Sequence, residues 1–348
     1  TSNPHDSTGK ALGAPEIVDS NLKNSWGISL SSGSPFWVAD QRTSVSTLYA
    51  GDHLQPDGTV SPITKVPLTV TIPPAPGRTQ GSPTGTVFNN TGSATDFLLA
   101  NGRPASFIFD GLDGTITAWN SGDGTTAELK KTVSGAAYTG LAIGTISTGA
   151  NFLYAANQAT GKIDVFDKNF QLTTLGPGGN FEDPNLPPGS PFRAFNIQNL
   201  GGLFYVTYDK VVTSGGVTDR EHDGIVDVFD TDGHFLRRVV TGGVNAPWGL
   251  ALAPDKFGPF GGDLLVGNFG FGDGKINVYD PNTGKFLGNL TDADGTAIAI
   301  EGLWALTFGN GGSGGDPFAL YFAAGINRTG PGSFGAADGL FGSIRAVS

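Results

Sequence analysis

Oxygen-bearing side chains recur at the ends of four similar apolar segments of this sequence. They belong to Asp40, Asp110, Asn157 and Asn268. Carboxylate and amide oxygens are the ligands that calcium prefers in proteins. A fold that gathers the four segments around one axis would therefore create a calcium site. Asp and Asn at strand ends also bond their own backbone in turns, so a metal centre and a set of turn caps both remain open interpretations.

The four histidines are a weaker signal. None of His5, His53, His222 and His234 has a partner at a metal-ligand spacing such as His-x-x-x-His. His222 and Asp223 end a charged segment, 219–223, that contains an imidazole, three carboxylates and a guanidinium. This segment predicts either a binding or general-base site, in which a carboxylate orients the imidazole, or a solvated charged loop.

Common catalytic signatures give no nucleophile. The chain has no cysteine, which excludes a thiol nucleophile and a disulfide framework. Residues 311–315 match Gly-x-Ser-x-Gly, but they lie in a glycine-rich stretch without the strand-to-helix setting of a nucleophile elbow. Asp-Gly clusters such as 230–233 and 292–295 lack the ligand spacing of an EF-hand and are typical of hairpin turns. No residue is predicted to be catalytic.

An internal repeat positions the candidate residues. Similar apolar strand openings recur about every 55 residues, at positions 26, 85, 140, 195, 248 and 304. A second strand, a third strand with an aromatic residue near its end and a weaker fourth strand follow in most repeats. Four short antiparallel strands separated by glycine-rich turns are typical of a β-propeller blade. Trp26, Trp248 and Trp304 recur in the first strands, and we expect them to be buried between neighbouring blades.

The number of blades follows from the length of the chain. Six repeats occupy nearly all of the 348 residues, so residues 1–348 are predicted to form one all-β domain, a six-bladed β-propeller with four antiparallel strands per blade. The last repeat has only three strands, the third expected at 340–347. A closed ring has to cover its last sheet edge. We therefore expect the strand-like segment 15–20, within the N-terminal segment 1–20, to supply the outer strand of the last blade.

Charge and composition restrict partners and location. The net charge of −11, from 31 acidic and 20 basic residues, argues against nucleic acid, because phosphate binding depends on clustered Lys and Arg. No run approaches the ~18 apolar residues of a membrane span. The sequence starts without Met and carries Asn-x-Ser/Thr triplets at Asn89, Asn289 and Asn327. We expect a chain that is secreted after removal of a signal peptide and is extracellular or bound to the cell surface.

Several segments resemble an uncharacterised family of exported bacterial proteins related to NHL-repeat propellers. They are 24–29, 35–40, 195–199, 246–254, 262–270 and 338–344. The resemblance covers nearly the whole chain. It implies a six-bladed propeller that is usually exported and often associated with the cell surface. It implies no established activity and no catalytic residues.

The loops separate onto two faces of the predicted ring. Loops between second and third strands, and loops entering the next blade, share one face, called here the loop-decorated face. It carries the long loops 176–192, 209–223 and 325–338, and the opposite face carries 89–104, 254–262 and 309–317. Binding residues are often found on loops held by a rigid scaffold.

We therefore expect a non-enzymatic binding or assembly module that binds a protein, a glycan or a second copy of itself through the loop-decorated face. The candidate binding residues are Asp40, Asp110, Asn157, Asn268, His222 and Asp223. The alternative is a metal-dependent hydrolase or lyase at the mouth of the central channel, with calcium held by Asp40, Asp110, Asn157 and Asn268.

Overall fold

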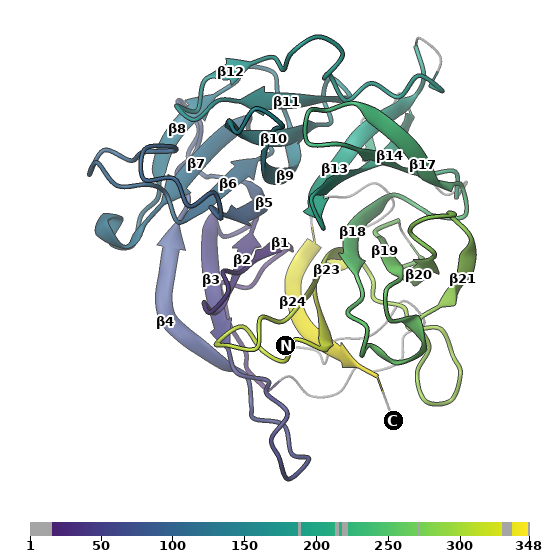
Figure 1. Cartoon of the computed structure of the whole chain (residues 1–348). Coiled ribbons are helices and arrows are strands. Elements are labelled where there is room, and N and C mark those ends of the chain that lie inside the picture. The colour runs from purple at the N-terminus through teal and green to yellow at the C-terminus, as the bar shows by residue number, and fades with distance from the viewer. Residues whose placement is uncertain are drawn as a thin grey trace.

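Six antiparallel sheets surround a common centre and form a six-bladed β-propeller, as predicted (Figure 1). The computed structural model describes residues 16–186, 189–212, 216–217, 222–270, 272–328 and 336–346. Within these ranges the only helices are two 3-10 turns, η1 (Ser121–Asp123) and η2 (Gly258–Phe260). Neither has the length or apolarity to span a bilayer.

Each blade consists of consecutive strands in chain order. Blade 1 contains β1 (Ser25–Ser29), β2 (Phe36–Asp40), β3 (Val45–Ala50) and β4 (Thr64–Thr71), and blade 2 contains β5 (Pro83–Phe88), β6 (Phe107–Gly111), β7 (Thr115–Trp119) and β8 (Glu128–Thr132). Blade 3 contains β9 (Tyr138–Thr145), β10 (Asn151–Asn157), β11 (Lys162–Phe166) and β12 (Leu172–Thr173). Blade 4 contains β13 (Phe192–Leu200), β14 (Leu203–Val212), β16 (Ile225–Phe229) and β17 (Phe235–Thr241), with the short β15 (Gly216–Val217) paired to β14. Blade 5 contains β18 (Pro247–Leu252), β19 (Leu264–Asn268), β20 (Ile276–Tyr279) and β21 (Phe286–Asn289), and blade 6 contains β22 (Leu303–Phe308), β23 (Ala319–Arg328) and β24 (Ala336–Arg345).

The recurring glycine of the first strands has a steric cause. A Cβ atom on Gly249 would lie 2.3 Å from the carbonyl oxygen of Trp304 in the next blade, and one on Gly85 would lie 2.4 Å from the backbone nitrogen of Leu141. Neighbouring first strands thus approach each other more closely than any side chain would allow. The repeat signature in the sequence is therefore a packing requirement at the centre of the ring.

The apolar core lies between neighbouring blades. One cluster joins Ile108 and Ile116 of blade 2 to Leu141 and Leu153 of blade 3. Successive side chains of a strand point to opposite faces of its sheet. Because both faces of each sheet are covered by other blades, the inner strands are buried along almost their whole length, as β2, β6 and β7 show.

The last sheet differs from the expected closure. In the described residues it has three strands, and its third strand begins at Ala336 rather than at the predicted 340. Residues 16–20 form no strand, and Pro15 lies outside the described residues. The chain turns here, because the carbonyl and carboxylate oxygens of Asp19 accept hydrogen bonds from the backbone of Leu22 at 3.2 Å and of Asn21 at 2.9 Å.

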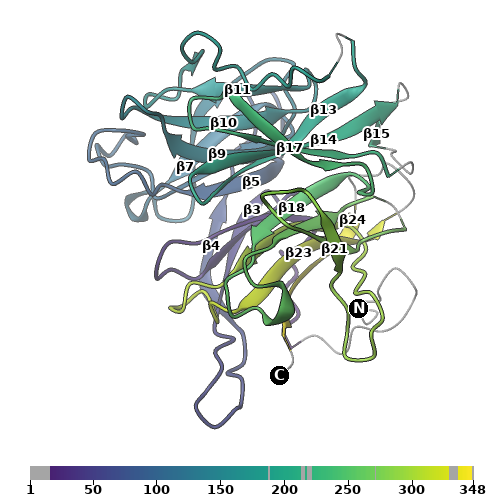
Figure 2. The same cartoon turned by 45° about the vertical axis from the view of Figure 1, so that its right-hand side comes forward.

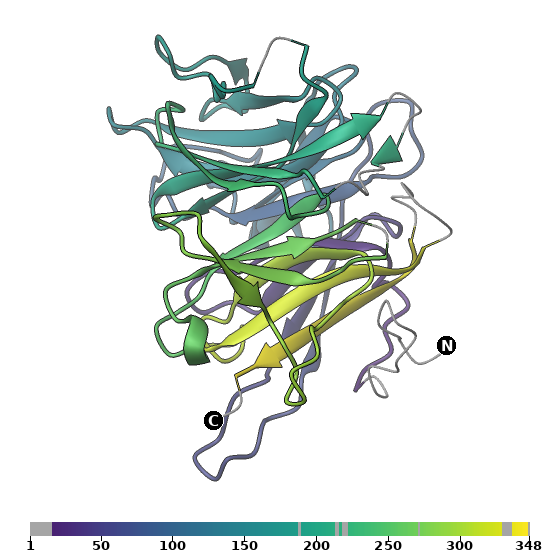
Figure 3. The same ribbon diagram turned by 90° about the vertical axis from the view of Figure 1, so that its right-hand side faces the viewer.

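Side chains of the first and last blades close the ring. Arg345 of β24 donates to Asp316 at 2.5 Å and to the carbonyl oxygen of Asp52, in the β3–β4 loop of blade 1, at 2.7 Å. Beside this contact, Phe36 of blade 1 packs on Tyr321 and Phe341 of blade 6 with ring centroids 4.3 and 5.2 Å apart. Viewed from the side, the hairpin 51–63 projects below the ring (Figure 3).

Candidate functional site

Aromatic side chains fill the centre of the ring. Trp26, Trp248 and Trp304 are 0%, 3% and 0% exposed. Trp304 stacks on Trp26 with centroids 3.4 Å apart and on Phe269 with centroids 3.7 Å apart, while Trp248 meets both indoles edge-on. The expected burial of the three indoles is confirmed. They contact one another across the axis, however, and are not confined to the interfaces between neighbouring blades.

The central channel leaves only a small void. A cavity of about 30 Å³ is bordered by first-strand residues of all six blades, among them Gly27, Thr86, Leu141, Gln198 and Ala305. One water needs roughly 10–15 Å³ of such space. This void therefore has room for one or two waters and not for a substrate.

Asp40 is buried at the end of β2 and bonds to both neighbouring strands. Its carboxylate oxygens accept hydrogen bonds from the hydroxyls of Ser25 and Thr47, each at 2.6 Å. Burial raises the pKa of Asp40 to about 8, and the two hydroxyl bonds only partly oppose this shift. This shift favours the protonated form of the carboxyl group.

Asp110 occupies the same position in blade 2 and is less completely bonded. Its Oδ1 accepts hydrogen bonds from the Thr84 hydroxyl at 2.7 Å and from the Gly85 backbone N–H at 2.6 Å. Its Oδ2 is buried and has no hydrogen-bond partner among the described residues. Burial raises the pKa of Asp110 to about 7.

The two predicted amide ligands are also bonded. Asn157 accepts from the backbone of Ala137 at 3.2 Å and donates to Asp164 at 2.9 Å. Asn268 accepts from the backbone of Asn245 at 2.7 Å and donates to Asn277 at 3.0 Å. Each hydrogen bond joins residues of one blade, but none of the four is made to the backbone of the residue's own turn, as the turn-cap interpretation would require.

Two of the predicted ligands pair with residues that directly precede central tryptophans. Trp26 directly follows Ser25, the donor to Asp40, and Trp248 directly follows Pro247, which pairs with Asn268. Asp40 and Asn268 therefore lie beside first strands that carry two of the central indoles. Calcium binding by Asp40, Asp110, Asn157 and Asn268 stays a prediction. All four side chains already accept hydrogen bonds through an oxygen, and Oδ2 of Asp110 has no partner among the described residues.

His222 and Asp223 lie at the interface of blades 4 and 5. The half-exposed imidazole has its Nδ1 3.4 Å from Oδ2 of Asp273, a residue of blade 5. Asp223 forms an ion pair with Lys210 at 3.0 Å. The backbone N–H of Gly243 donates to the carbonyl oxygen of His222 at 2.5 Å. Residues 219–221 of the predicted charged segment lie outside the described residues.

A much larger cavity lies at the same interface. Figure 2 labels β17 and β21, two of the strands that contribute to its walls. Its volume of about 570 Å³ is in the range of small-molecule sites, roughly 300–1,000 Å³, and the cavity is widely open to solvent. Residues of β17, of the following loop and of the β20–β21 hairpin line it: Arg238, Val239, Thr241, Gly242, Gly243, Asn277, Tyr279, Thr283, Gly284 and Phe286. Since Gly243 bonds His222, the cavity adjoins the segment that the sequence singled out.

A chain of neutral hydrogen bonds fixes the buried part of this cavity. The Asn277 amide accepts from Asn268 and Asn289, each at 3.0 Å. It donates to the Gly243 carbonyl at 2.9 Å and to the Tyr279 hydroxyl at 3.3 Å. Asn268, predicted as a ligand at the central axis, also supports the cavity through its hydrogen bond to Asn277.

The charged residues beside the cavity neutralise one another. Nε of Arg238 donates to Asp227 at 2.9 Å, and its Nη2 forms an ion pair with Asp183. Burial raises the pKa of Asp227 to about 7, against the lowering effect of Arg238. The guanidinium already has two carboxylate partners and is not available as an anion site.

Sequence reasoning missed Tyr279 and Phe286. Tyr279 ends a third strand in the same way as Trp119 and Phe166, and Phe286 is one apolar residue of a weak fourth strand. Nothing in the sequence distinguishes these two cavity-lining aromatic residues from aromatic residues of the core.

The β16–β17 turn brings Asp230, Asp232 and His234 together with their ligand atoms within 4.8 Å of one another. Asp230 accepts from the His234 backbone at 2.9 Å and lies 3.0 Å from its Nδ1. This arrangement confirms the hairpin turn predicted for the Asp-Gly cluster.

The architecture defines the class of the protein as a six-bladed β-propeller. No protein-family model matches the chain. It is 30% identical to the uncharacterised protein R648 of Acanthamoeba polyphaga mimivirus over 305 residues, which cover 83% of this chain and 69% of that protein. The chain therefore belongs to the same family as R648.

Two further uncharacterised proteins of the same virus are related. R640 and L690 are 33% and 34% identical over 58% and 56% of this chain. The chain spans only 38% and 49% of their lengths. These relatives correct the expected bacterial family, because they are viral, and the relation to NHL-repeat proteins finds no support.

Solved structures match the chain at low similarity. Virginiamycin B lyase from Staphylococcus aureus is 13% identical with a TM-score of 0.43, over 87% of this chain and 79% of that chain. A protein of unknown function from Bacteroides thetaiotaomicron is 11% identical with a TM-score of 0.48, over 99% of this chain and 75% of that chain. Similarities of this size carry no argument about activity.

Proposed function

We propose that this propeller is an exported, non-enzymatic binding module whose ligand occupies the cavity between blades 4 and 5. The observation that carries the proposal is the cavity itself, which combines a volume of about 570 Å³ with hydrogen-bonding groups held in place by Asn277. Pre-organised polar groups in a concave site are the usual basis of ligand recognition. The partner is a protein, a glycan or a second copy of the chain.

Two further features support a binding role away from the axis. The central void of about 30 Å³ is too small for a substrate. The cavity adjoins His222 at the edge of the loop-decorated face, where rigid blades hold long loops. Export agrees with a chain that contains neither cysteine nor methionine, the two readily oxidised side chains.

The test uses a variant that fills the cavity. Thr241→Trp places an indole at the exposed end of β17, among the lining residues. Leu129→Trp places the same group on β8, the outer strand of blade 2, and serves as the matched control. Wild type and both variants are compared on a glycan array, on an array of purified extracellular protein domains and by analytical ultracentrifugation for self-association.

We expect at least one binding signal that wild type and Leu129→Trp share and that Thr241→Trp loses. If every binding signal survives in Thr241→Trp, or if none exists in wild type, the cavity is not the ligand site.

The second candidate is the metal-dependent hydrolase or lyase, and one observation favours it. The Oδ2 atom of Asp110 is buried without a hydrogen-bond partner among the described residues, and an unpaired buried polar atom is costly. A calcium ion there would supply a partner and shift the group to its ionised form. This candidate predicts stoichiometric metal by elemental analysis and a lower melting temperature after chelation. The binding module predicts neither.

A further inference from the structure

We propose that the cavity between blades 4 and 5 binds a neutral sugar residue, with Phe286 as its stacking surface and the Tyr279 hydroxyl as a hydrogen-bond donor. This inference rests on the proposed function, since it names the ligand of the same cavity. Three properties of the lining residues support it.

The first property is a hydroxyl group with unused bonding capacity. The Tyr279 oxygen accepts one hydrogen bond, from Asn277 at 3.3 Å, and its proton has no acceptor among the described residues. Burial raises the pKa of Tyr279, so the group stays a neutral donor over the physiological range. An apolar ligand would cover this hydroxyl without pairing it, which costs free energy. A sugar hydroxyl would accept its proton.

The second property is an exposed aromatic ring at the cavity wall. Phe286 is 50% exposed, and it pairs across the strands with Tyr279, with ring centroids 5.4 Å apart. The buried tyrosine ring thus supports the phenylalanine ring from one side. An exposed, supported aromatic face offers the apolar C–H face of a pyranose a surface to stack on, beside polar groups that bond its hydroxyls.

The third property is the charge balance. Arg238 is paired with Asp227 and Asp183, and no other lining residue carries a charge. The chain as a whole has a net charge of −11, which repels anionic ligands. The ligand should therefore be a neutral hexose or N-acetylhexosamine and not a uronic acid.

The experiment measures saturation-transfer NMR and titration of three disaccharides: cellobiose, N,N′-diacetylchitobiose and digalacturonate. We expect binding of at least one neutral disaccharide and none of digalacturonate. Phe286→Ala should weaken neutral binding about tenfold, and Tyr279→Phe should weaken it severalfold. Leu287→Ala, the matched control, removes a neighbouring apolar side chain that is 40% exposed and does not line the cavity, so affinity should stay unchanged.

The outcomes separate this inference from the proposed function. Binding of digalacturonate alone, or neutral binding that ignores both Phe286→Ala and Tyr279→Phe, would overturn the sugar assignment. If neither neutral disaccharide binds while Thr241→Trp still abolishes binding to a protein domain, the sugar assignment fails and the binding module stands. If no ligand is sensitive to Thr241→Trp, both fail.

Discussion

Replacing Trp304 by alanine tests whether the aromatic cluster holds the blades together. The indole is fully buried and stacks on Trp26 at 3.4 Å and on Phe269 at 3.7 Å. Removing a buried Trp side chain costs about 3–5 kcal/mol. Each aromatic contact adds about 0.5–1.5 kcal/mol beyond area burial. Trp304→Ala should therefore lower the free energy of unfolding by about 5 kcal/mol.

The measurement is urea unfolding followed by far-ultraviolet circular dichroism, because the substitution itself changes tryptophan fluorescence. A double-mutant cycle isolates the contact. Trp304→Ala combined with Trp26→Ala should show a coupling of about 1–3 kcal/mol, whereas Trp304→Ala combined with Trp119→Ala should be additive within about 0.5 kcal/mol. Trp119 belongs to a separate cluster with Trp37. A loss below about 1 kcal/mol for Trp304→Ala, or no coupling to Trp26, would refute the structural role of the cluster.

Three further predictions concern closure, pH and blade spacing. Arg345→Met removes the cation between the mostly buried carboxylates of Asp52 and Asp316 and should lower the free energy of unfolding by about 3–5 kcal/mol. A urea midpoint equal to that of wild type would show that this contact does not help to close the ring. The pKa of Asp40 is raised from 3.8 to about 8 in the folded state, so the native state binds more protons than the unfolded state, and the free energy of unfolding falls as pH rises from about 4 to about 8. In urea titrations across this pH range, Asp40→Asn should show a smaller fall than wild type. Equal falls in the two proteins would contradict the raised pKa of Asp40. Gly249→Ala should lower the free energy of unfolding by about 1–3 kcal/mol, because its Cβ atom would clash with the Trp304 carbonyl. Gly33→Ala is the control, since a Cβ atom there meets no atom within 4 Å, and it should have the melting temperature of wild type.

The sequence was sufficient to predict the fold because the repeat is a direct record of packing. Each first strand carries the residues that let blades meet at the axis, such as Gly249 against Trp304. Each second strand is buried on both faces and reads as an apolar run, as in Phe36–Asp40. These constraints act at every blade, so they reappear about every 55 residues and can be recognised without a structure.

Ring closure was not predictable in the same way. The segment 15–20 reads as a strand, but local hydrogen bonds to Asp19 turn the chain at residues 19–22. One of the contacts that join blades 1 and 6 is the hydrogen bond from Arg345 to Asp52, 293 residues away along the chain. Contacts between unrelated loops have no period and leave no pattern in a single sequence.

The polar ring of second-strand residues illustrates the limit for the site. Its positions were predicted correctly, since Asp40 and Asn268 do end β2 and β19. Their surroundings could not be predicted from the repeat, because the space between them depends on how side chains of neighbouring first strands pack. Repeat positions fix the backbone, whereas the side chains that fill the axis decide between a metal centre and a packed core.

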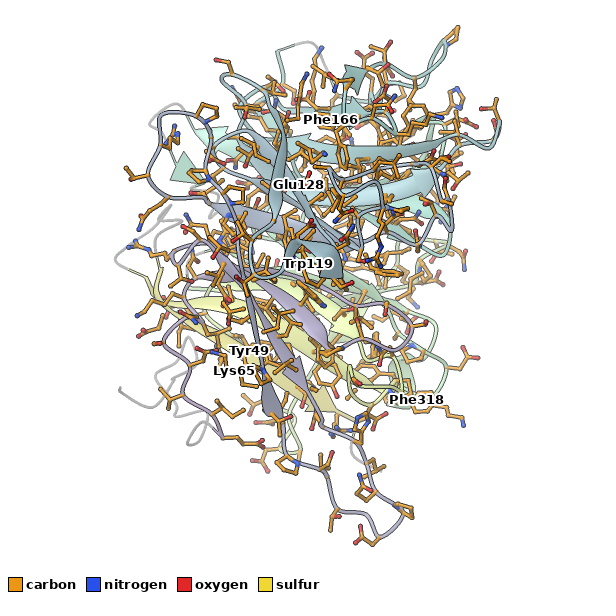
Figure 4. All side chains as sticks on the ribbon, turned by 90° about the vertical axis from the view of Figure 1, so that its left-hand side faces the viewer. Tyr49, Lys65, Trp119, Glu128, Phe166 and Phe318 are labelled. Carbon is orange, nitrogen blue, oxygen red and sulfur yellow. The ribbon has the colours of Figure 1, made fainter. Side chains whose placement is uncertain are left out.

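The cavity of blade 5 has a closed counterpart in blade 1. Tyr49 and Tyr279 hold the same place on their third strands, opposite Lys65 and Phe286 respectively. In blade 1 the Tyr49 hydroxyl donates to Asp19 at 2.8 Å, and Asp19 pairs with Lys65 at 2.7 Å; Figure 4 shows Tyr49 beside Lys65. The chain itself thus satisfies in blade 1 the hydroxyl that we assign to a ligand in blade 5.

This comparison gives a last prediction. Asp19→Asn keeps an acceptor for Tyr49 but loses the ion pair with a partly exposed lysine, which should cost about 0–1 kcal/mol. Asp19→Ala also leaves the Tyr49 hydroxyl, in a side chain only 3% exposed, without its acceptor, which should cost a further 1–3 kcal/mol or so. Equal urea midpoints for the two variants would mean that a buried tyrosine hydroxyl at this position needs no acceptor. In that case the hydroxyl of Tyr279 would give no reason to expect a sugar in blade 5. The two Asp19 variants therefore also test the argument from the unpaired Tyr279 hydroxyl.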